Sequence, residues 1–263
     1  TSPFAFTGNK FEFRALGSSQ NIATANISLN AAMACALDDI ANGLETALAA
    51  GTPLNTAIQK LLENLFREHM PIVFDGNNYS NEWLEEAARR GLPNFKDTVS
   101  ALQHYSEPDV MNVFSSQGIL NAREMSSRQE ILFEHYTHTI CIEANLALRI
   151  GRTTILPSAL DYQEHLAKVA ERTAALAGEA SMETAYFRRV RTHVTGLMTA
   201  LDALEDLCSK ASGKGSAMEN ALFARDHLLP AMQQCREHAD ALECLCRDKD
   251  WPLPLYAELL WMY

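Results

Sequence analysis

The sequence contains no run of eighteen or more apolar residues, so it holds no segment that could cross a bilayer as a helix. Basic residues are also scarce, since 22 Lys and Arg stand against 33 Asp and Glu, which gives a formal net charge of −11. A chain of that sign lacks the basic surface that nucleic-acid binding requires. We therefore expect neither a membrane nor a nucleic acid among the partners of this protein.

Cysteine is sparse and scattered. The six cysteines are Cys35, Cys141, Cys208, Cys235, Cys244 and Cys246. A chain of 263 residues with 47% hydrophobic residues can bury a sizeable core and does not need a disulfide scaffold. Most of these cysteines fall on apolar helical positions, where a free thiol behaves as a small hydrophobe. This pattern favours a reducing, cytoplasmic environment.

The first fourteen residues contain the pattern of a β-hairpin, over residues 3–14. Gly8 and Asn9 supply a two-residue loop with glycine first, which suits a type II′ turn. In that register the aromatic residues pair across the strands, Phe6 with Phe11 and Phe4 with Phe13. All four rings then share one face, an arrangement that stabilises a sheet through cross-strand contacts.

Three charged residues, Lys10, Glu12 and Arg14, alternate along the other face of the second strand. Residues two apart on a strand lie roughly 6.6 to 7 Å apart on one face. A carboxylate between two cations could bind a metal ion while the cations hold phosphate or carboxylate groups. From spacing alone a solvated ladder of charges is the simpler interpretation, because one carboxylate is not a complete site for a hard cation.

The remainder of the chain has mainly helical periodicity. We expect helices over about 28–50, 53–69, 81–90, 108–117, 122–150, 158–209 and 216–248. Pro157 and the linker at 209–217 separate the last three, of which the final two fit an antiparallel helical hairpin. The predicted fold class is α+β and predominantly α-helical: a short N-terminal β-hairpin from a larger sheet, then helices and the long helical hairpin. A segment with two prolines and no strong period predicts a boundary between domains at 1–95 and 96–263.

Two groups of metal-ligating residue types stand out on the predicted helices. His135 and His138 share a helix face with Glu134 and Glu143 nearby, so a metal pair is geometrically feasible, although an ordinary polar face is the simpler interpretation. The second group is Cys235, His238, Cys244 and Cys246. Its spacing does not match a zinc knuckle and favours thiols that belong to the core or the surface.

Two further patterns have a structural and a functional interpretation. Three arginines, Arg188, Arg189 and Arg191, could contact a nucleic acid or an acidic partner, but the acidic surroundings favour a solvated helix face. Apolar stripes run along the last two helices, at Leu201, Leu204 and Leu207 and at Leu242 and Leu245. These stripes indicate mutual core packing, with an oligomer contact as the alternative.

Several stretches of the chain resemble one enzyme family. They are "TSPFAFTGNKFEFR", "RGLPNFKDTVSALQHYSEPDVMNVFSSQGILNARE", "ILPSALDYQEHLA" and "DWPLPLYAELL". All four are similar to segments of the type III glutamine synthetases, in the order in which they occur there. The resemblance implies that residues 1–95 are the C-terminal part of a catalytic domain and that residues 96–263 are the helical C-terminal domain of the family.

The resemblance also implies an activity and site residues. Glutamine synthetases join ammonia to the γ-carboxylate of glutamate with ATP as substrate, through a γ-glutamyl phosphate, and use Mg²⁺ or Mn²⁺. By the family motif Glu12 is a metal ligand and Arg14 is a catalytic residue that contacts phosphate or the transferring group. Lys10 is a cation facing the nucleotide, at a position where other types more often have Arg, and it lacks the bidentate fork of Arg. Such residue types suit phosphoryl transfer, which requires positioning and charge neutralisation.

The family forms stacked rings, so a homo-oligomer, a double-ring dodecamer, is the expected assembly. The other metal ligands and the nucleotide pocket would lie upstream of Thr1, so we expect the isolated chain to be inactive. The alternative is a free-standing helical interaction module without catalysis. The aromatic face of the hairpin argues against this alternative, because a two-stranded hairpin is marginal without a surface to pack on.

Overall fold

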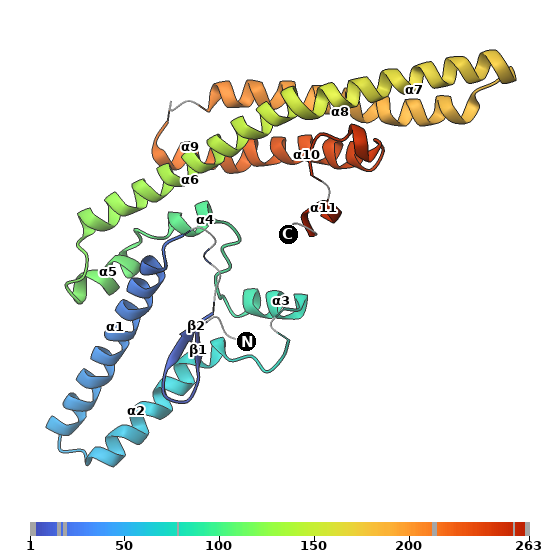
Figure 1. The fold of residues 1–263 in the computed structure, drawn as a ribbon. Helices are drawn as coiled ribbons and strands as arrows, with labels where there is room; N and C mark the ends of the chain where they lie inside the picture. Colours follow the sequence, from blue (N-terminus) through green and yellow to red (C-terminus); the bar gives the residue numbers. More distant parts are fainter. Residues whose placement is uncertain are drawn as a thin grey trace. The chain divides into compact units, whose positions relative to one another are not determined.

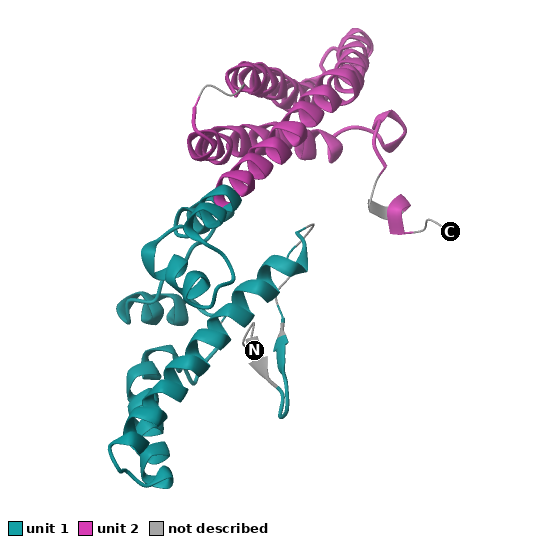
Figure 2. Ribbon diagram, turned by 90° about the vertical axis from the view of Figure 1, so that its left-hand side faces the viewer, with its two compact units in different colours: residues 1–128 teal, residues 129–263 magenta. Residues whose placement is uncertain are grey.

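The structure, a computed structural model, describes residues 4–14, 17, 20–77, 79–211, 215–254 and 256–260. The described chain is predominantly helical with one pair of strands, which confirms the predicted fold class (Figure 1). It divides into two compact units, residues 1–128 (unit 1) and residues 129–263 (unit 2) (Figure 2). The predicted domain boundary at residue 95 stays a prediction.

Unit 1 opens with the hairpin, strands β1 (Phe4–Phe6) and β2 (Phe11–Phe13). They pair antiparallel, with Phe4 opposite Phe13 and Phe6 opposite Phe11, so the predicted register is confirmed. The backbone N–H of Thr7 donates to the carbonyl of Lys10 at 2.9 Å and closes the two-residue loop. Gly8 has φ +98°, a conformation that the first position of a primed turn requires and that glycine adopts without strain.

The helices of unit 1 are α1 (Ile22–Ala49), α2 (Leu54–His69), the 3₁₀ turn η1 (Met70–Ile72), α3 (Asn81–Arg89), α4 (Thr98–Gln103) and α5 (Pro108–Ser116). Helix α1 begins earlier than expected, at Ile22 rather than near residue 28. The cause is a cap: the side chain of Asn21 accepts a hydrogen bond from the N–H of Ala23 at 2.8 Å. Helix α1 ends before Gly51, which has φ +83°, as predicted.

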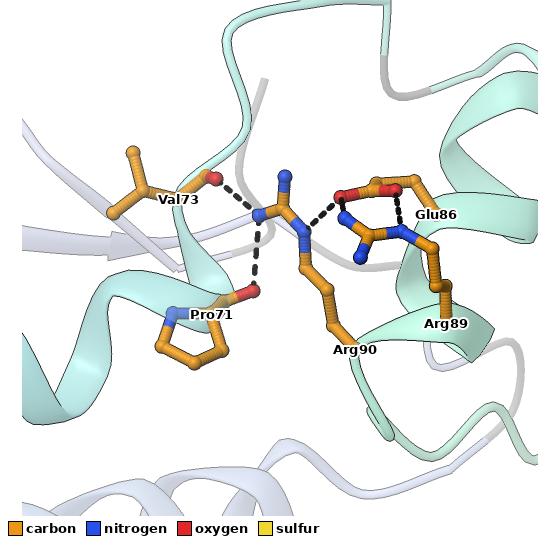
Figure 3. A network of polar contacts seen from close by, with 5 residues as sticks. All are labelled: Pro71, Val73, Glu86, Arg89 and Arg90. Carbon is orange, nitrogen blue, oxygen red and sulfur yellow. Dashed lines mark hydrogen bonds and ion pairs between the residues drawn. The ribbon is translucent and has the colours of Figure 1, made fainter.

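A polar network joins α3 to the segment that follows α2 (Figure 3). The carboxylate of Glu86 pairs with the guanidinium groups of Arg89 and Arg90, and these two partners lower its pKa from 4.5 to about 2. Arg90 also donates through Nη1 to the backbone carbonyls of Val73, at 2.5 Å, and Pro71, at 3.2 Å. The network therefore fixes the chain after α2 against the C-terminal end of α3.

An apolar groove lies between α1 and α2. Its cavity of about 750 Å³ has mostly hydrophobic walls, which include Ile40, Leu61, Leu65, Phe66, Met70 and Val73. Much of this surface is open, since Phe66 is 69% exposed. Unit 1 therefore leaves the inner faces of its two longest helices only partly covered.

The elements of unit 2 are the end of α6 (Ala122–Ile150), the π-helical turn η2 (Gly151–Ile155), α7 (Leu156–Ala177), α8 (Ser181–Lys210), α9 (Ala217–Phe223), the π-helical turn η3 (Ala224–Leu228), α10 (Leu229–Glu243), the 3₁₀ turn η4 (Asp248–Asp250) and α11 (Tyr256–Leu260). Helix α6 has the bounds that were predicted. Helices α7, α8 and α10 pack side by side around one core (Figure 1). The pairing of α8 with α10 confirms the predicted helical hairpin.

The prediction of one helix over 158–209 was wrong, because the chain turns back after Ala177. Gly178 has φ +78° and its N–H donates to the carbonyl of Ala174 at 2.9 Å, which ends α7 in a left-handed cap. Helix α8 then starts at Ser181. The chain therefore forms two helices, α7 and α8, that pack against each other, where the sequence pattern predicted one continuous helix.

The expected break at Pro157 was also wrong, because the helix continues through it by way of a widened turn. In η2 the N–H of Leu156 donates to the carbonyl of Gly151, five residues earlier. Proline clashes with the carbonyl four residues before it in a regular α-helix, and a π-turn displaces that carbonyl. A second π-turn, η3, precedes Pro230 in the same way, and in it the N–H of Leu229 donates to the carbonyl of Ala224.

Candidate functional site

The candidate site is the polar face of the hairpin, where the structure brings Lys10, Glu12 and Arg14 together as predicted. The Glu12 carboxylate lies between the two cations: Lys10 Nζ is 3.3 Å from Oε1 and Arg14 Nη2 is 2.8 Å from Oε2. Arg14 Nε also donates to Oε2 at 3.1 Å, so the guanidinium uses two of its N–H donors on one oxygen. Both cations are exposed, whereas Glu12 is about one-third exposed.

Thr7 belongs to the same face and was missed by the sequence reasoning. Its hydroxyl lies 3.2 Å from Glu12 Oε1, to which it donates, and 3.3 Å from the carbonyl oxygen of Lys10. Thr7 stands opposite Lys10 across the loop, which makes it a diagonal neighbour of Glu12 on one face. The strand alternation that placed the charged residues could therefore have found Thr7 as well.

The contacts of Glu12 hold it in its ionised form. Hydrogen bonds from Arg14, then Lys10, then Thr7 lower the pKa of the Glu12 carboxyl below its ordinary value of 4.5. A carboxylate that stays charged at any physiological pH is a suitable oxygen ligand for a hard cation, and the exposed amino and guanidinium groups beside it suit a phosphate. The face therefore combines one carboxylate that can ligate a metal ion with two cationic groups that can donate hydrogen bonds to a phosphate.

This face does not by itself make a metal centre. Among the described residues, no three His, Cys, Asp or Glu side chains come close enough together to hold a metal ion. Both oxygens of Glu12 are already engaged by cations and a hydroxyl. A divalent ion at Glu12 would need its other ligands from beyond the described residues.

The other candidates of the sequence analysis belong to unit 2 and not to the hairpin. His135 and His138 are both exposed on α6, and the arginines at 188, 189 and 191 are exposed on α8, as a solvated face predicts. The cysteines are free, and burial raises the pKa values of the Cys235 and Cys246 thiols to about 11. Both thiols are buried groups of the unit 2 core.

The apolar stripes belong to the core of unit 2, which confirms their structural interpretation. Leu201, Leu204 and Leu242 are fully buried, and Leu245 is 6% exposed in the same cluster. Trp251, an aromatic residue of the C-terminal segment, also joins this cluster at 8% exposure. The side chains of Tyr256 and Trp261, two further aromatic residues of that segment, lie outside the described residues.

Comparison with known proteins identifies the class to which this architecture belongs. Residues 57–174 match the family model described as the glutamine synthetase C-terminal domain. This match covers the end of unit 1 and the start of unit 2 and does not include the hairpin.

In the described part of the chain, no helix combines the length and apolar character that a membrane span needs.

Whole-chain similarity extends the match to the hairpin. The chain is 34% identical to a glutamine synthetase of Bacteroides fragilis (strain YCH46), over 99% of this chain and 36% of the relative. It is also 34% identical to a type-3 glutamine synthetase of Dictyostelium discoideum, over 100% of this chain and 36% of the relative. A glutamine synthetase of Butyrivibrio fibrisolvens is 31% identical over 99% of the chain.

These matches confirm the resemblance to the type III glutamine synthetases that the sequence motifs indicated. The chain corresponds to a C-terminal portion of such a protein, and it spans little more than a third of the length of the relatives that it matches.

Proposed function

We propose that this chain is the C-terminal part of a type III glutamine synthetase, an ATP-dependent ligase that joins ammonia to the γ-carboxylate of glutamate through a γ-glutamyl phosphate. The observation that supports this proposal best is the similarity of the whole chain, hairpin included, to proteins named glutamine synthetase. The longer enzyme would act in glutamine biosynthesis in the cytoplasm, as a double-ring dodecamer. Residues 1–95 would complete its catalytic domain and residues 96–263 would form its helical C-terminal domain.

Within that enzyme the hairpin would form one wall of the active site. Glu12, held ionised by its neighbours, would supply one oxygen ligand to Mg²⁺ or Mn²⁺, with the other ligands contributed by residues outside this chain. Arg14 would act as the catalytic residue on the transferring phosphoryl group, because its planar guanidinium can bind two phosphate oxygens at once. Lys10 would place a point charge beside the nucleotide phosphates. The distances around Glu12 support these roles, because one short strand presents all three groups together.

The apolar groove of unit 1 agrees with a larger catalytic domain. Helix α2 and the turn η1 after it keep large apolar side chains such as Phe66 and Ile72 exposed, at 69% and 65%. A protein surface of this kind is stabilised when further chain covers it. We therefore expect the isolated 263 residues to lack ligase activity, so magnesium-dependent release of ADP by this chain alone would contradict the proposal.

The role of Glu12 can be tested in the longer enzyme by replacing the carboxylate. We expect Glu12→Gln to lower turnover by at least about 100-fold and to weaken the binding of Mn²⁺, because loss of a direct ligand exceeds the usual effect of its supporting partners. Turnover is measured as ADP release that depends on glutamate and ammonia, and Mn²⁺ affinity by electron paramagnetic resonance.

Glu63→Gln serves as the control, because Glu63 is an exposed acid on α2 that also pairs with an arginine, Arg67, at 2.7 Å. Its replacement should leave both quantities near the wild-type values. Normal Mn²⁺ affinity and turnover in Glu12→Gln would refute the ligand assignment, whatever the family of the enzyme.

A further inference from the structure

A pair of histidines lies between two long helices of unit 2, far in sequence from the hairpin. His193 is on α8 and His238 is on α10, and their Nδ1 atoms are 3.4 Å apart. The ring centroids are 5.6 Å apart with the planes inclined at 59°, so the rings are not stacked. Two imidazole nitrogens can lie this close when one donates a hydrogen bond to the other or when both direct lone pairs at one cation.

The separation of the two nitrogens fits shared coordination. Zinc binds histidine nitrogens at about 2.0 to 2.1 Å with tetrahedral angles, which places two such nitrogens about 3.3 Å apart. The observed 3.4 Å is long for a hydrogen bond between nitrogens, whereas it matches this requirement closely. The two nitrogens are therefore already at the separation that a shared ion requires.

Gly196 fixes the position of one of the rings. A Cβ atom added at Gly196 would lie 2.4 Å from Cε1 and 2.5 Å from Nε2 of His238, which real atoms do not tolerate. The His238 ring therefore rests directly on the backbone of α8, one turn after His193. The core around it is close-packed, with Val194 and Leu197 on α8 and Cys235 on α10 all buried. A site carried by two packed helices holds its ligands more precisely than one on loops.

A cavity lies beside one member of the pair, His238. This cavity of about 310 Å³ is lined by Gly196 and His238 together with polar residues that include Thr195, Thr199, Gln234 and Glu237. Two protein nitrogens leave two positions of a tetrahedral ion open, and waters or a small anion can occupy them. The site therefore needs no third protein ligand within the described chain, where no triad of metal-ligating side chains is present.

We propose that His193 and His238 bind a first-row divalent metal ion of the imidazole-binding class, represented by Zn²⁺, and so cross-link α8 to α10. Imidazole nitrogen selects Zn²⁺, Cu²⁺ and Ni²⁺ and not the oxygen-seeking Mg²⁺ of the proposed active site. The low pKa of His193 supports the proposal, because burial, His238 and Arg189 keep the ring neutral and its lone pair available. The proposed site uses residues of unit 2 and does not involve Glu12, and its existence does not depend on the proposed ligase function.

Calorimetric titration of Zn²⁺ into the chain tests the proposal, with millimolar Mg²⁺ present to occupy oxygen sites. The background carries Cys244→Ser, because Cys244 is an exposed thiol that could itself take up zinc. We expect one zinc ion per chain, with affinity at least tenfold weaker in His193→Gln and in His238→Gln. His135→Gln/His138→Gln is the matched control, a pair of exposed histidines on α6 that should leave the affinity unchanged.

A measurement on the unsubstituted histidines guards against variants that fail to fold. In chain labelled with ¹⁵N-histidine, Zn²⁺ should shift the Nδ1 resonances of His193 and His238 and leave those of the other histidines in place. The proposal is overturned by an absence of zinc binding up to millimolar concentration. It is equally overturned if the control pair, and not His193 and His238, accounts for the zinc that binds.

Discussion

The two units of this chain differ in how far they complete their own cores, although both are built from long helices. In unit 2, twenty buried residues form one continuous cluster, contributed by the helices α6, α7, α8 and α10, the π-turns η2 and η3, and the segment after α10. In unit 1 the corresponding buried cluster contains Ala31, Phe114 and Met125. The apolar faces of α1 and α2 instead line an open groove. Helix content alone is therefore a poor guide to which part of a chain is self-sufficient.

The difference follows from how many helices meet on each apolar stripe. Helix α8 contacts α7 on one side and α10 on another, so its stripe of leucines is covered from two directions. Helix α2 contacts α1 and the short turn after it, which leaves Leu62 at 44% and Phe66 at 69% exposure. Burial of each such side chain contributes about 1.5 to 3 kcal/mol, and unit 1 realises only part of that contribution.

Truncation of a leucine in each unit should reveal the largest contrast. Leu201 is fully buried and its methyl groups lie against Gly151, so Leu201→Ala should lower the free energy of unfolding by about 2 to 5 kcal/mol. Leu62→Ala, at a 44% exposed position of unit 1, should lower it by less than about 1 kcal/mol. Urea titrations of the two variants measure both values. Equal losses would show that the groove of unit 1 is packed as tightly as the core of unit 2.

The second-largest expected effect is a difference in how the stability of the two units changes in mild acid. The pKa of His193 is lowered from 6.5 in the folded chain, first by burial and then by His238 and Arg189. Below about pH 6.5 the unfolded chain therefore binds more protons than the folded one, and unit 2 loses stability as the pH falls. Glu86 in unit 1 has a pKa lowered from 4.5 to about 2, so its contribution is lost only between those values.

Amide exchange reports this contrast region by region. Between pH 7 and pH 5, protection corrected for the intrinsic rate should fall in α8 and α10 and stay constant in α3. His193→Gln should remove the pH dependence in α8, because the residue no longer titrates. A parallel loss of protection in α3 over the same range would contradict the assignment of the effect to the histidine pair.

The smallest expected effect concerns the polar network between α3 and the segment that follows α2. Arg90→Gln removes the donation to the carbonyls of Pro71 and Val73, which should accelerate exchange of the Val73 amide roughly three- to tenfold. Arg89→Gln is the control, since Arg89 contacts the same carboxylate from a 73% exposed position and should change that rate less than about twofold. Similar rates in the two variants would mean that the carbonyl contacts of Arg90 do not hold this segment.

The sequence predicted the elements with strong local signals and missed the long-range ones. Gly8 and the alternating phenylalanines specify the hairpin register. The continuous periodicity of 122–150 predicts the first and last residues of α6 correctly. The turn at Gly178 was missed because good helix formers flank it, and a single glycine inside a helical pattern is tolerated. At the candidate site, alternation placed Lys10, Glu12 and Arg14 on one face. The approach of His193 to His238, 45 residues apart, depends on helix packing that no local pattern encodes.

The π-turns at Gly151–Ile155 and Ala224–Leu228 have a consequence for how such chains are compared. A π-turn accommodates one residue more than an α-turn, so every side chain beyond it is rotated by about 100° relative to an uninterrupted helix. An alignment that runs without a gap across 151–155 would match core positions of one protein to surface positions of another wherever the second lacks the turn. A one-residue gap at these two places is therefore the physically correct alignment with a relative whose helices are regular.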